Sequence, residues 1–395
     1  MPNTYSSIRR NVRLDLTHEV FFTRDAFDAD NSTLSDLLKG DKLGNKTKAI
    51  VYLDEGILDG NPNLPHSITN YFKAHSDSLN LVCAPAFVRG GEEAKNEWQL
   101  VETIWSDLNK YGMCRHSYVI VIGGGASLDL VGFAASTAHR GVRLVRFPTT
   151  TLSQGDGGVG VKNGINFFGK KNWVGTFAVP EAVVNDFSFL RTLPDNQKRA
   201  GYVEAIKVAL IRDRAFFEWI ESRASELAQF QAQPMEQLIR RSAALHLDHI
   251  AGSGDPFERG SARPLDFGHW IAHKLEPMSD FQVGHGDAVA IGLAADVLYC
   301  AKVGLLKEEA AERVLDLLQA LGFETYHPLL HAKNNSGGSI ILDGLEEFRE
   351  HLGGKLTITL IQALGQGVEV HRMDNEQVLL SIDDLRTRSL AHSRA

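Results

Sequence analysis

The sequence predicts an α/β domain of the Rossmann-like type in residues 1–190, followed by a mainly α-helical domain in residues 191–395. In the first half, short β-branched runs alternate with glycine-rich turns and helical patterns, which is typical of a parallel sheet covered by helices. After about Arg191 the apolar residues recur with the period of an α-helix. The chain has 395 residues, 43% of them hydrophobic, enough to bury two cores.

The strands of the predicted sheet are runs of β-branched and aromatic residues that stop at a turn-forming residue. The clearest run leads directly into Gly123, Gly124 and Gly125, after which a helical pattern begins. The earliest run ends at Asp54 and the last ends at Pro148. We predict strands at Ala49–Leu53, Leu79–Ala84, Tyr118–Ile122 and Val142–Phe147.

The second half is predicted to begin near Phe189–Asp195 and to contain little strand before Lys355–Ile361. The polar stretch His331–Ser339 is predicted to be an exposed loop. The helices that we predict from the 3.6-residue period are Arg199–Leu210, Ala215–Phe230 and Met235–Ile250.

Charge and cysteine content exclude several classes of protein. Lys and Arg total 41 against 49 Asp and Glu, a net charge of −8, so no nucleic-acid partner is expected. Cys83, Cys114 and Cys300 form no closely spaced pair, which argues against a disulfide framework and a thiolate zinc site. No signal peptide is evident and no apolar run is long enough to cross a bilayer. We therefore expect a soluble, cytoplasmic protein with no membrane partner.

The first candidate site is the glycine turn in VIVIGGGASLDLVGFAA. Glycines let backbone N–H groups approach an anion, and the following helix N-terminus adds a favourable dipole. Asp54 at a strand end is placed to accept hydrogen bonds from a ribose diol, and Glu92 and Lys95 follow in a charged loop. Taken singly, a plain tight turn, an N-cap at Asp54 and solvated charges explain these features as well. Together they favour a dinucleotide site.

A second group of residues has the composition of a metal site. His269 and His273 in FGHWIAHKLE are four residues apart and share one face of a helix. His285 lies between two glycines, and Glu204 and Lys207 share a helical face upstream. One carboxylate and imidazoles with an open position suit a catalytic divalent metal, most simply zinc, with cobalt as an alternative. Structural histidines and a buried Glu204–Lys207 ion pair are the competing interpretations.

The segment PTTTLSQGDGGVGVKNGINFFGKKNW is rich in glycines, hydroxyls, amides and cations. Its glycines allow backbone amides to converge, and Lys162, Lys171 and Asn172 are candidates for binding phosphate oxygens. Asp156 is a candidate for holding a sugar hydroxyl. The alternative is a flexible, solvated loop.

These motifs, in this order, resemble those of the sugar phosphate cyclases, the family of dehydroquinate synthase and the 2-epi-5-epi-valiolone and 2-deoxy-scyllo-inosose synthases. The resemblance spans roughly Asp54 to Gly365. The matching motifs are GGG-x3-D at Gly123–Asp129, RG at Arg140, PTT at Pro148, D-x5-K at Asp156–Lys162, KN at Lys171–Asn172, G-x2-E-x2-K at Gly201–Lys207, GH-x3-H at Gly268–His273 and HG-x-AV at His285–Val289.

The resemblance implies an NAD-binding first domain, a metal-binding second domain and a homodimer in which Arg140 reaches the partner subunit. The implied metal ligands are Glu204, His269 and His285. The implied NAD contacts are Asp54, Glu92, Lys95, Gly124, Gly125, Ala126, Asp129, Thr149, Thr150, Lys162 and Lys171. The implied catalytic and substrate-binding residues are Asp156, Lys162, Lys171, Asn172, Lys207, Arg263, Asp266 and His273.

Four positions depart from dehydroquinate synthase. Its lysine aligns with His246, its arginine with Ala262 beside Arg263, its asparagine with Asp266, and its DKK-type segment with Glu350–Leu356. These changes fall where a carboxylated substrate would be held. The pattern ARPLDFGHW is closer to the cyclases that use neutral ketose phosphates, and we predict sedoheptulose 7-phosphate as the substrate.

The implied reaction consists of transient oxidation of a hydroxyl by NAD, elimination of phosphate, reduction and intramolecular aldol addition, which together yield a carbocyclic cyclitol. A divergent 3-dehydroquinate synthase is one alternative. A glycerol-dehydrogenase-like oxidoreductase shares the two-domain plan, the glycine turn and a metal, and has no need of the phosphate-binding cluster. A non-catalytic descendant is the third alternative, against which intact Glu204, His269 and His285 argue.

Overall fold

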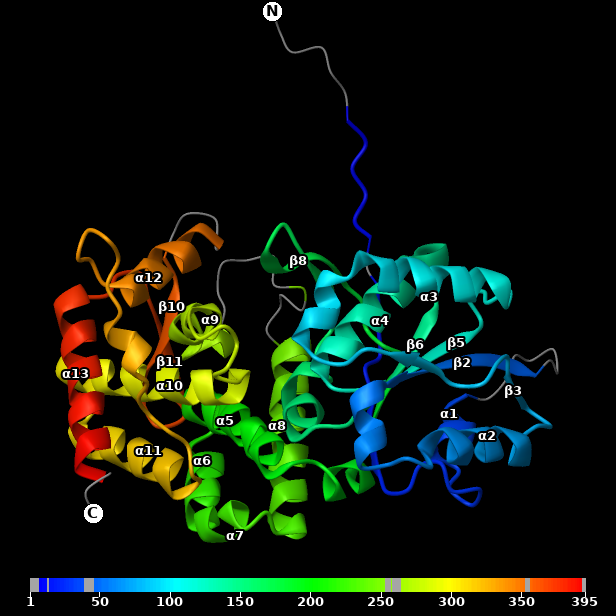
Figure 1. Cartoon of the computed structure of the whole chain (residues 1–395), viewed down its shortest axis with the longest axis horizontal. Coiled ribbons are helices and arrows are strands. Elements are labelled where there is room, and N and C mark those ends of the chain that lie inside the picture. Colours follow the sequence, from blue (N-terminus) through cyan, green and yellow to red (C-terminus); the bar gives the residue numbers. More distant parts are fainter. Residues whose placement is uncertain are drawn as a thin grey trace, which may run out of the picture.

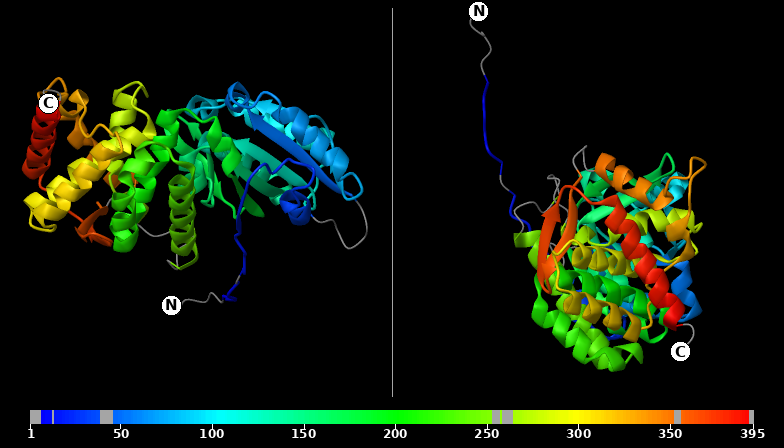
Figure 2. Two further views of the ribbon diagram at one scale, coloured as in Figure 1. Left: turned by 90° about the horizontal axis from the view of Figure 1, so that it is seen from below. Right: turned by 90° about the vertical axis from the view of Figure 1, so that its left-hand side faces the viewer.

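The computed structural model describes residues 7–12, 14–38, 46–252, 257, 264–351 and 356–392. Figure 1 shows two parts side by side, a parallel sheet with its covering helices and a group of packed helices that carries a small second sheet. The view from below in Figure 2 shows the same division. The predicted fold class, a Rossmann-like α/β domain followed by a mainly helical one, is confirmed. The boundary near residue 190 stays a prediction.

The large sheet has seven strands within the described residues, in the order β1–β9–β6–β5–β2–β3, and β4 also pairs with β2. Every pairing in it is parallel, so the carboxyl ends of neighbouring strands meet at one edge. The four predicted strands are all present, although the second is shorter than expected. The strands are β1 (Val20–Thr23), β2 (Thr47–Asp54), β3 (Leu79–Leu81), β4 (Ala86–Val88), β5 (Tyr118–Gly123), β6 (Arg143–Pro148) and β9 (Ala182–Asp186).

Helices cover both faces of this sheet because alternate side chains of its central strands point to opposite sides. On β2, Ala49, Val51 and Leu53 pack with α1 and α2, whereas Ile50 and Tyr52 pack with α3 and α4. These continuous apolar runs are typical of a parallel sheet buried on both faces. The helices are α1 (Thr33–Leu37), α2 (Leu64–Ala74), α3 (Trp98–Lys110) and α4 (Gly125–Thr137).

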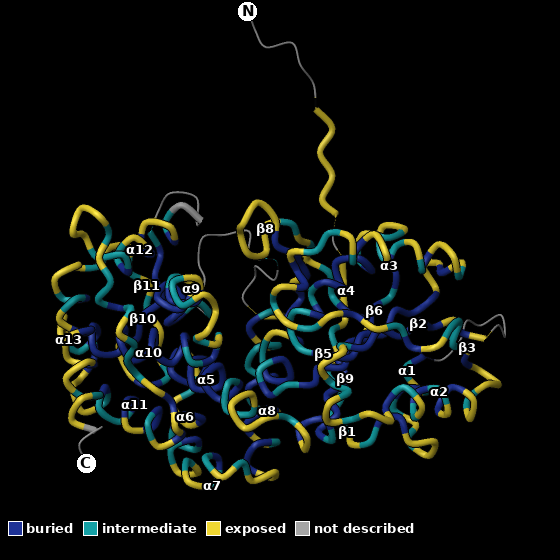
Figure 3. The backbone as a smooth tube through the Cα atoms, viewed as in Figure 1, coloured by how far each residue is buried: buried dark blue, intermediate teal, exposed yellow. Residues whose placement is uncertain are grey.

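The helical part shares one continuous core, with α5 and α10 at its centre. Both helices are buried on all sides over most of their length, as Figure 3 shows, because other helices enclose them. No helix of the described chain is long and apolar enough to cross a membrane. The helices are α5 (Asp195–Arg212), α6 (Arg214–Ser222), α7 (Ala224–Ala228), α8 (Ala232–Gly252), α9 (His269–Met278), α10 (His285–Lys302), α11 (Glu308–Ala320), α12 (Ile340–His351) and α13 (Asn375–His392).

Some predicted elements differ in detail from the structure. The helix predicted at Ala215–Phe230 is divided at Arg223, because the chain leaves helical geometry there between α6 and α7. The strand predicted at Lys355–Ile361 is β10 (Ile358–Ala363), which forms a two-stranded antiparallel sheet with β11 (Gln366–Val370). The stretch 332–339 is a loop, as predicted, closed by a bridge between Lys333 and Ser339.

The segment interpreted as a phosphate-binding loop is in part a β-hairpin. β7 (Lys162–Phe167) and β8 (Lys170–Phe177) pair in antiparallel fashion, apart from the large sheet. Figure 1 shows this hairpin between α4 of the sheet domain and α9 of the helical part. It therefore stands where the two parts of the molecule face one another.

Candidate active site

Three side chains of the helical part converge on one point. Glu204 lies within α5, and His269 and His285 are the first residues of α9 and α10. One potential ligand atom of each residue lies within 4.8 Å of those of the other two. The Nε2 atoms of His269 and His285 are 3.8 Å and 3.6 Å from Glu204 Oε1. The structure thus brings together the three residues predicted as metal ligands.

Glycines allow the helices that carry these residues to approach closely. A Cβ atom on Gly292 of α10 would lie 2.0 Å from the carbonyl oxygen of Gly268, the residue before α9. Gly268 itself has a φ of 76°, which glycine adopts at little cost. Next to His285, a Cβ atom on Gly286 would lie 2.7 Å from Cα of Ala200 in α5. Larger residues at these positions would push the three helices, and hence the cluster, apart.

Hydrogen bonds hold the outer nitrogens of both imidazole rings. His269 Nδ1 lies 3.1 Å from the carbonyl oxygen of Phe267, and His285 Nδ1 lies 2.9 Å from Glu276 Oε1. When each Nδ1–H donates, each Nε2 presents a lone pair toward Glu204. Both Glu204 carboxylate oxygens are buried, and Oε1, which faces the two Nε2 atoms, accepts no hydrogen bond from the described residues, whereas Oε2 forms an ion pair with Lys207. A buried carboxylate facing two imidazole lone pairs fits a divalent metal ion.

The charges of the cluster depend on one another. Although burial alone would raise it, the positive charge of Lys207 lowers the pKa of Glu204 to about 2. Burial and the charge of Lys207 hold the pKa of His269 well below its usual value. Burial also disfavours the charged form of His285, but contacts with Glu204 and Glu276 raise its pKa to about 9. Without a metal, a proton on His285 thus balances the carboxylates, and a divalent cation would replace it.

Acidic groups surround the buried ammonium group of Lys207. Lys207 forms an ion pair with Glu204, and its Nζ lies 3.9 Å from Asp156 Oδ2. Despite its burial, the charges of Glu204, Asp156 and Asp266 raise the pKa of Lys207, so it stays protonated. On the other side of Asp156, His246 Nδ1 lies 2.5 Å from Asp156 Oδ1. Three carboxylates therefore share one lysine in this part of the site.

The backbone around Asp156 is held by a buried arginine that sequence reasoning missed. Arg146, on β6, is fully buried, and its guanidinium donates to the carbonyl oxygens of Gly160 at 2.7 Å and Lys162 at 2.8 Å. It also donates to Asn163 Oδ1 at 2.6 Å. These bonds hold the turn after Asp156 and the start of β7 against the sheet. In the sequence, Arg146 is hidden inside the apolar run predicted as a strand.

The β7–β8 hairpin carries Lys162, Lys171 and Asn172, the three residues predicted to bind phosphate, and all three are exposed. The neighbours Lys171 and Asn172 reach in different directions. Lys171 Nζ lies 3.1 Å from Glu276 Oε2 of α9, whereas Asn172 Oδ1 accepts a hydrogen bond from Lys95 of the sheet domain. The hairpin thus contacts both parts of the molecule.

The glycine turn lies at the carboxyl edge of the sheet, between β5 and α4. Gly124 precedes the helix and Gly125 begins it, and a Cβ atom on Gly125 would meet nothing within 4 Å. The open N-terminus of α4 therefore has room for an anionic group. Asp54 lies beside this turn, but its carboxylate already accepts hydrogen bonds from the Gly56 N–H at 2.9 Å and the Ser127 hydroxyl at 2.6 Å. It caps the turn after β2, the alternative considered from the sequence.

Lys95 is buried rather than solvated, with 3% of its side chain exposed. It lies in a short 3-10 helix, η2 (Glu92–Asn96), and its Nζ is 2.8 Å from Asp129 and 3.7 Å from Glu92. Glu92 accepts a further hydrogen bond from Asn166 of β7 at 3.1 Å. The charged loop expected from the sequence is therefore a folded network that joins η2, α4 and the hairpin.

The other predicted residues lie beside the glycine turn, beside the cluster or away from both. Thr149 donates its N–H to the Gly123 carbonyl at 3.0 Å, and Thr150 bonds to Ser153. Ala126 is half-buried in the first turn of α4. The ring of His273 lies 5.4 Å from that of His269, and Arg140 is exposed after α4. Ala262, Arg263 and Lys355 lie outside the described residues.

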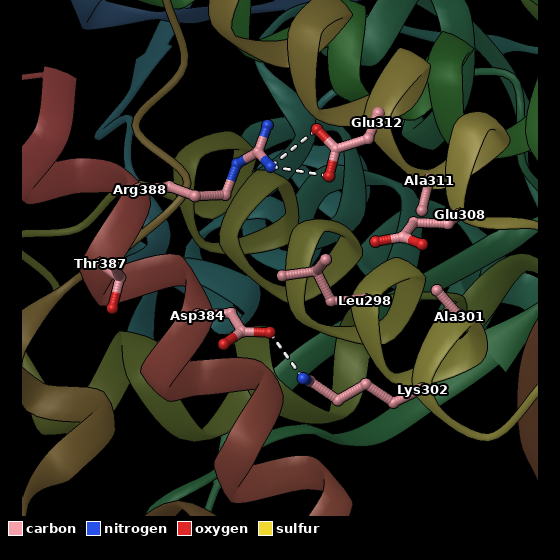
Figure 4. Close-up of a pocket in the computed structure, with 9 residues that line it drawn as sticks. All are labelled: Leu298, Ala301, Lys302, Glu308, Ala311, Glu312, Asp384, Thr387 and Arg388. Carbon is pink, nitrogen blue, oxygen red and sulfur yellow. Dashed lines mark hydrogen bonds and ion pairs between the residues drawn. The ribbon is translucent and has the colours of Figure 1, made fainter.

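A separate cavity of about 380 Å³ lies between α10, α11 and α13 (Figure 4). Four of its five charged residues form ion pairs, Lys302 with Asp384 at 2.6 Å and Arg388 with Glu312 at 2.7 Å, and the fifth is Glu308. Lys302 is the last residue of α10 and His285 the first, so the cavity lies about 25 Å from the cluster along this helix. It has no part in the candidate site.

Comparison with known proteins places this geometry among the sugar phosphate cyclases. Two family models match, 3-dehydroquinate synthase N-terminal over residues 86–200 and 3-dehydroquinate synthase C-terminal over residues 201–336. The 3-dehydroquinate synthase of Nitrosospira multiformis is 37% identical over 298 residues, which cover 75% of this chain and 78% of that protein. The 2-epi-valiolone synthase of Actinosynnema mirum is 34% identical over 301 residues, 76% and 77% of the two chains.

A solved structure of 2-epi-5-epi-valiolone synthase from Streptomyces hygroscopicus, with NAD+ and Zn2+ bound, matches with a TM-score of 0.84 and 25% identity. The match covers 96% of this chain and 100% of that one. The chain belongs to the 3-dehydroquinate synthase family and is a cyclase of the dehydroquinate synthase and valiolone synthase type. Because relatives of nearly equal identity carry different names, the substrate has to be argued from the site itself.

Proposed function

We propose that this enzyme converts a ketose phosphate with a neutral head, with sedoheptulose 7-phosphate as the best single candidate, into a carbocyclic cyclitol with loss of phosphate. We further propose NAD and one divalent metal, zinc or cobalt, as its cofactors. The metal cluster, the open glycine turn and the NAD+ and Zn2+ of the valiolone synthase structure support this assignment. The observation that carries the choice of substrate is the excess of carboxylates around Lys207.

The charge around Lys207 is unsuited to a second anionic group. With Glu204 assigned to the metal, Asp156 and Asp266 still act on this lysine, and His246 is already paired with Asp156. An anion buried without a cationic partner costs several kcal/mol. Sugar hydroxyls, in contrast, donate hydrogen bonds to carboxylates. The site is therefore better matched to a polyol head than to a carboxylate.

When bound, NAD would accept and return a hydride, and the metal would polarise the oxygen at the carbon being oxidised. Lys207, held protonated by the surrounding carboxylates, would donate a hydrogen bond to a substrate oxygen beside Glu204. The pKa of Asp156 is lowered by Lys207 and His246 despite burial, so its oxygens stay acceptors for substrate hydroxyls. Lys162, Lys171, Asn172 and His273 would hold the phosphate and orient it for elimination.

The test of substrate class compares phosphate release from sedoheptulose 7-phosphate and from the carboxylated heptulosonate phosphate used by 3-dehydroquinate synthase. Both assays use the purified enzyme with NAD and zinc. We expect turnover of the neutral sugar and at least a tenfold lower kcat/KM, about 1.4 kcal/mol, for the carboxylated one. If the carboxylated sugar is turned over well and the neutral one is ignored, the protein is a divergent 3-dehydroquinate synthase.

Two variants test the cause of this preference. Asp266→Asn combined with His246→Lys removes one negative charge and adds one positive charge near Lys207. We expect the double variant to shift the kcat/KM ratio toward the carboxylated sugar. Glu347→Gln, which removes a carboxylate paired with Lys274 on the surface, is the matched control and should leave the ratio unchanged. An unchanged ratio in the double variant would mean that Asp266 and His246 do not determine the substrate preference.

Accumulation of NADH distinguishes the proposed cyclase from the alternative, a glycerol-dehydrogenase-like oxidoreductase. In a cyclase the hydride taken from the substrate is returned to it, so NADH does not accumulate. We expect the absorbance of NADH to stay flat while phosphate is released. NADH formed in equal amount to product, without phosphate release, would instead identify a glycerol-dehydrogenase-like enzyme.

A further inference from the structure

Glu276 is a buried acidic residue to which the proposed reaction gives no role. It lies near the end of α9, seven positions after His269, so both residues project from the same face of the helix. Only 3% of the residue is exposed. A carboxylate at such a depth is retained only with partners, because its desolvation would otherwise be costly.

The two oxygens of Glu276 serve two different partners. Oε1 lies 2.9 Å from Nδ1 of His285, the nitrogen that faces away from Glu204. Oε2 lies 3.1 Å from Nζ of Lys171 on strand β8. The carboxylate therefore spans the distance between the candidate metal cluster and the hairpin that carries the candidate phosphate-binding residues.

We propose that Glu276 is a positioning residue that fixes the ring of His285 for metal binding and at the same time ties the β7–β8 hairpin to the metal site. This inference rests on the proposed metal site. A carboxylate that accepts the outer N–H of a ligand imidazole sets the tautomer, orients the ring and increases its donor strength. Glu276 has the position for this effect, whereas the corresponding partner of His269 is only a backbone carbonyl.

Because Glu276 also contacts Lys171, it affects the position of the hairpin as well as that of His285. Asn172, the neighbour of Lys171, is bound to Lys95, so the hairpin is held on one side by the sheet domain and on the other by Glu276. Loss of Glu276 would release the second of these attachments. The lysine would then lose its ion pair, and its contact with the ring of Phe281, whose centroid lies 5.5 Å from Nζ, would remain.

The experiment measures binding of zinc alone to the full-length, metal-free protein, by competition with a coloured chelator. Glu276→Ala should weaken zinc affinity by about 10- to 100-fold, the range found for outer partners of metal-bound histidines. Glu276→Gln keeps an oxygen acceptor for the His285 N–H and should lose less than Glu276→Ala. The visible spectrum of the cobalt-loaded Glu276→Ala protein should also change, because the orientation of one ligand is no longer fixed.

Glu221→Gln is the matched control, because it removes a carboxylate of the helical part that pairs with Arg313 at 2.7 Å, away from the cluster. Thermal unfolding in chelator shows whether each variant folds. If Glu276→Ala does not fold, the zinc affinity of Glu276→Gln decides whether the inference holds. The inference is wrong if the folded Glu276 variants bind zinc as tightly as the Glu221→Gln protein does. His285→Ala distinguishes a failure of the proposed metal site from a failure of the role proposed for Glu276. Zinc retained by His285→Ala would overturn the metal site itself.

Discussion

The candidate metal cluster and the glycine-turn region differ in how far their buried polar groups are paired with other groups of the protein. At the cluster, Glu204 Oε1 faces the Nε2 atoms of two histidines and accepts no hydrogen bond from the described residues, whereas Oε2 forms an ion pair with Lys207. At the turn, Asp54 and Lys95 are already joined to partners of the protein itself. The first arrangement leaves one carboxylate oxygen and two imidazole nitrogens available to a cation, and the second is already satisfied by groups of the protein.

This difference determines how each region contributes to the free energy of folding and of ligand binding. Ligand atoms without a hydrogen-bond partner, such as Glu204 Oε1, are costly to bury, and a bound ion would offset that cost directly. A network of paired charges contributes to folding, and a bound nucleotide would add to it through the open N-terminus of α4. Substitutions should therefore affect metal binding and activity at the cluster, and folding stability at the turn.

The largest expected effect is the loss of activity when a ligand of the cluster is removed. We predict that His285→Ala lowers kcat/KM by at least about 10³-fold, because a metal supplies several kcal/mol of transition-state stabilisation. Metal content, measured on the purified protein, should fall at the same time. His116→Ala, an exposed histidine of the sheet domain, is the control and should behave as wild type. A His285→Ala enzyme with stoichiometric metal and normal turnover would contradict the assignment.

At the glycine turn, removal of a buried charged residue should lower the folding stability. Lys95→Met leaves Asp129 without its partner and should lower the free energy of unfolding by about 3 kcal/mol, the lower end of the range for buried pairs. The lower end applies because the Asp129 side chain is 25% exposed. Denaturation by urea in the absence of ligands measures this difference. Arg89→Met, which removes ion pairs at the surface, should cost less than about 1 kcal/mol. Equal losses in both variants would mean that the buried network adds nothing.

The elements that follow from local pattern were predictable from the sequence. The strand ending in Gly123 is evident because an apolar run stops at glycines, and helix α5 because its apolar residues recur every turn. The shared face of His269 and His273 follows from their spacing, and the structure places them on α9. The set Glu204, His269 and His285 was implied only by the resemblance to the sugar phosphate cyclases, because the three residues lie on different helices.

The groups that were missed depend on contacts between distant segments. Glu276 lies in the same HKLEP stretch as His273, but only the packing of α10 and the hairpin against α9 gives it His285 and Lys171 as partners. Arg146 is hidden in a strand whose other residues are apolar, and its acceptors belong to the following loop. Lys95 was predicted as a site residue, but its burial was not, because nothing near it in the sequence shows that Asp129 and Asn172 enclose it.

A smaller effect should appear when metal is added to the folded protein. Free zinc at one hundred times its dissociation constant should raise the free energy of unfolding by about 2.7 kcal/mol, because it binds only the native cluster. Urea denaturation with and without zinc measures this gain. His285→Ala should show little or none of it, while Lys95→Met should show all of it. A gain that is lost in Lys95→Met and kept in His285→Ala would reverse the contrast between the two regions.

The smallest expected effect concerns a buried carboxylate behind the cluster, Asp296 of α10. Its oxygens accept hydrogen bonds from the Gly268 N–H at 3.1 Å and the Trp270 indole N–H at 2.9 Å, on either side of His269 in the sequence. Burial nevertheless raises the pKa of Asp296 to about 7 from the usual 3.8. The folded protein therefore keeps a proton on Asp296 at pH values where the unfolded chain has lost it.

The sign of the pH dependence follows from that difference. A carboxyl group whose pKa is raised by folding stabilises the protein fully at low pH, and this contribution is lost as the pH rises from about 4 to about 7. Between pH 5 and pH 6 the free energy of unfolding of the wild type should fall by about 1 kcal/mol relative to that of Asp296→Asn, which cannot titrate. Urea denaturation of both proteins in chelator measures this. Parallel stability curves would show an ionised Asp296 that its two donors satisfy, and the region behind the cluster would then resemble the self-paired network of the glycine turn.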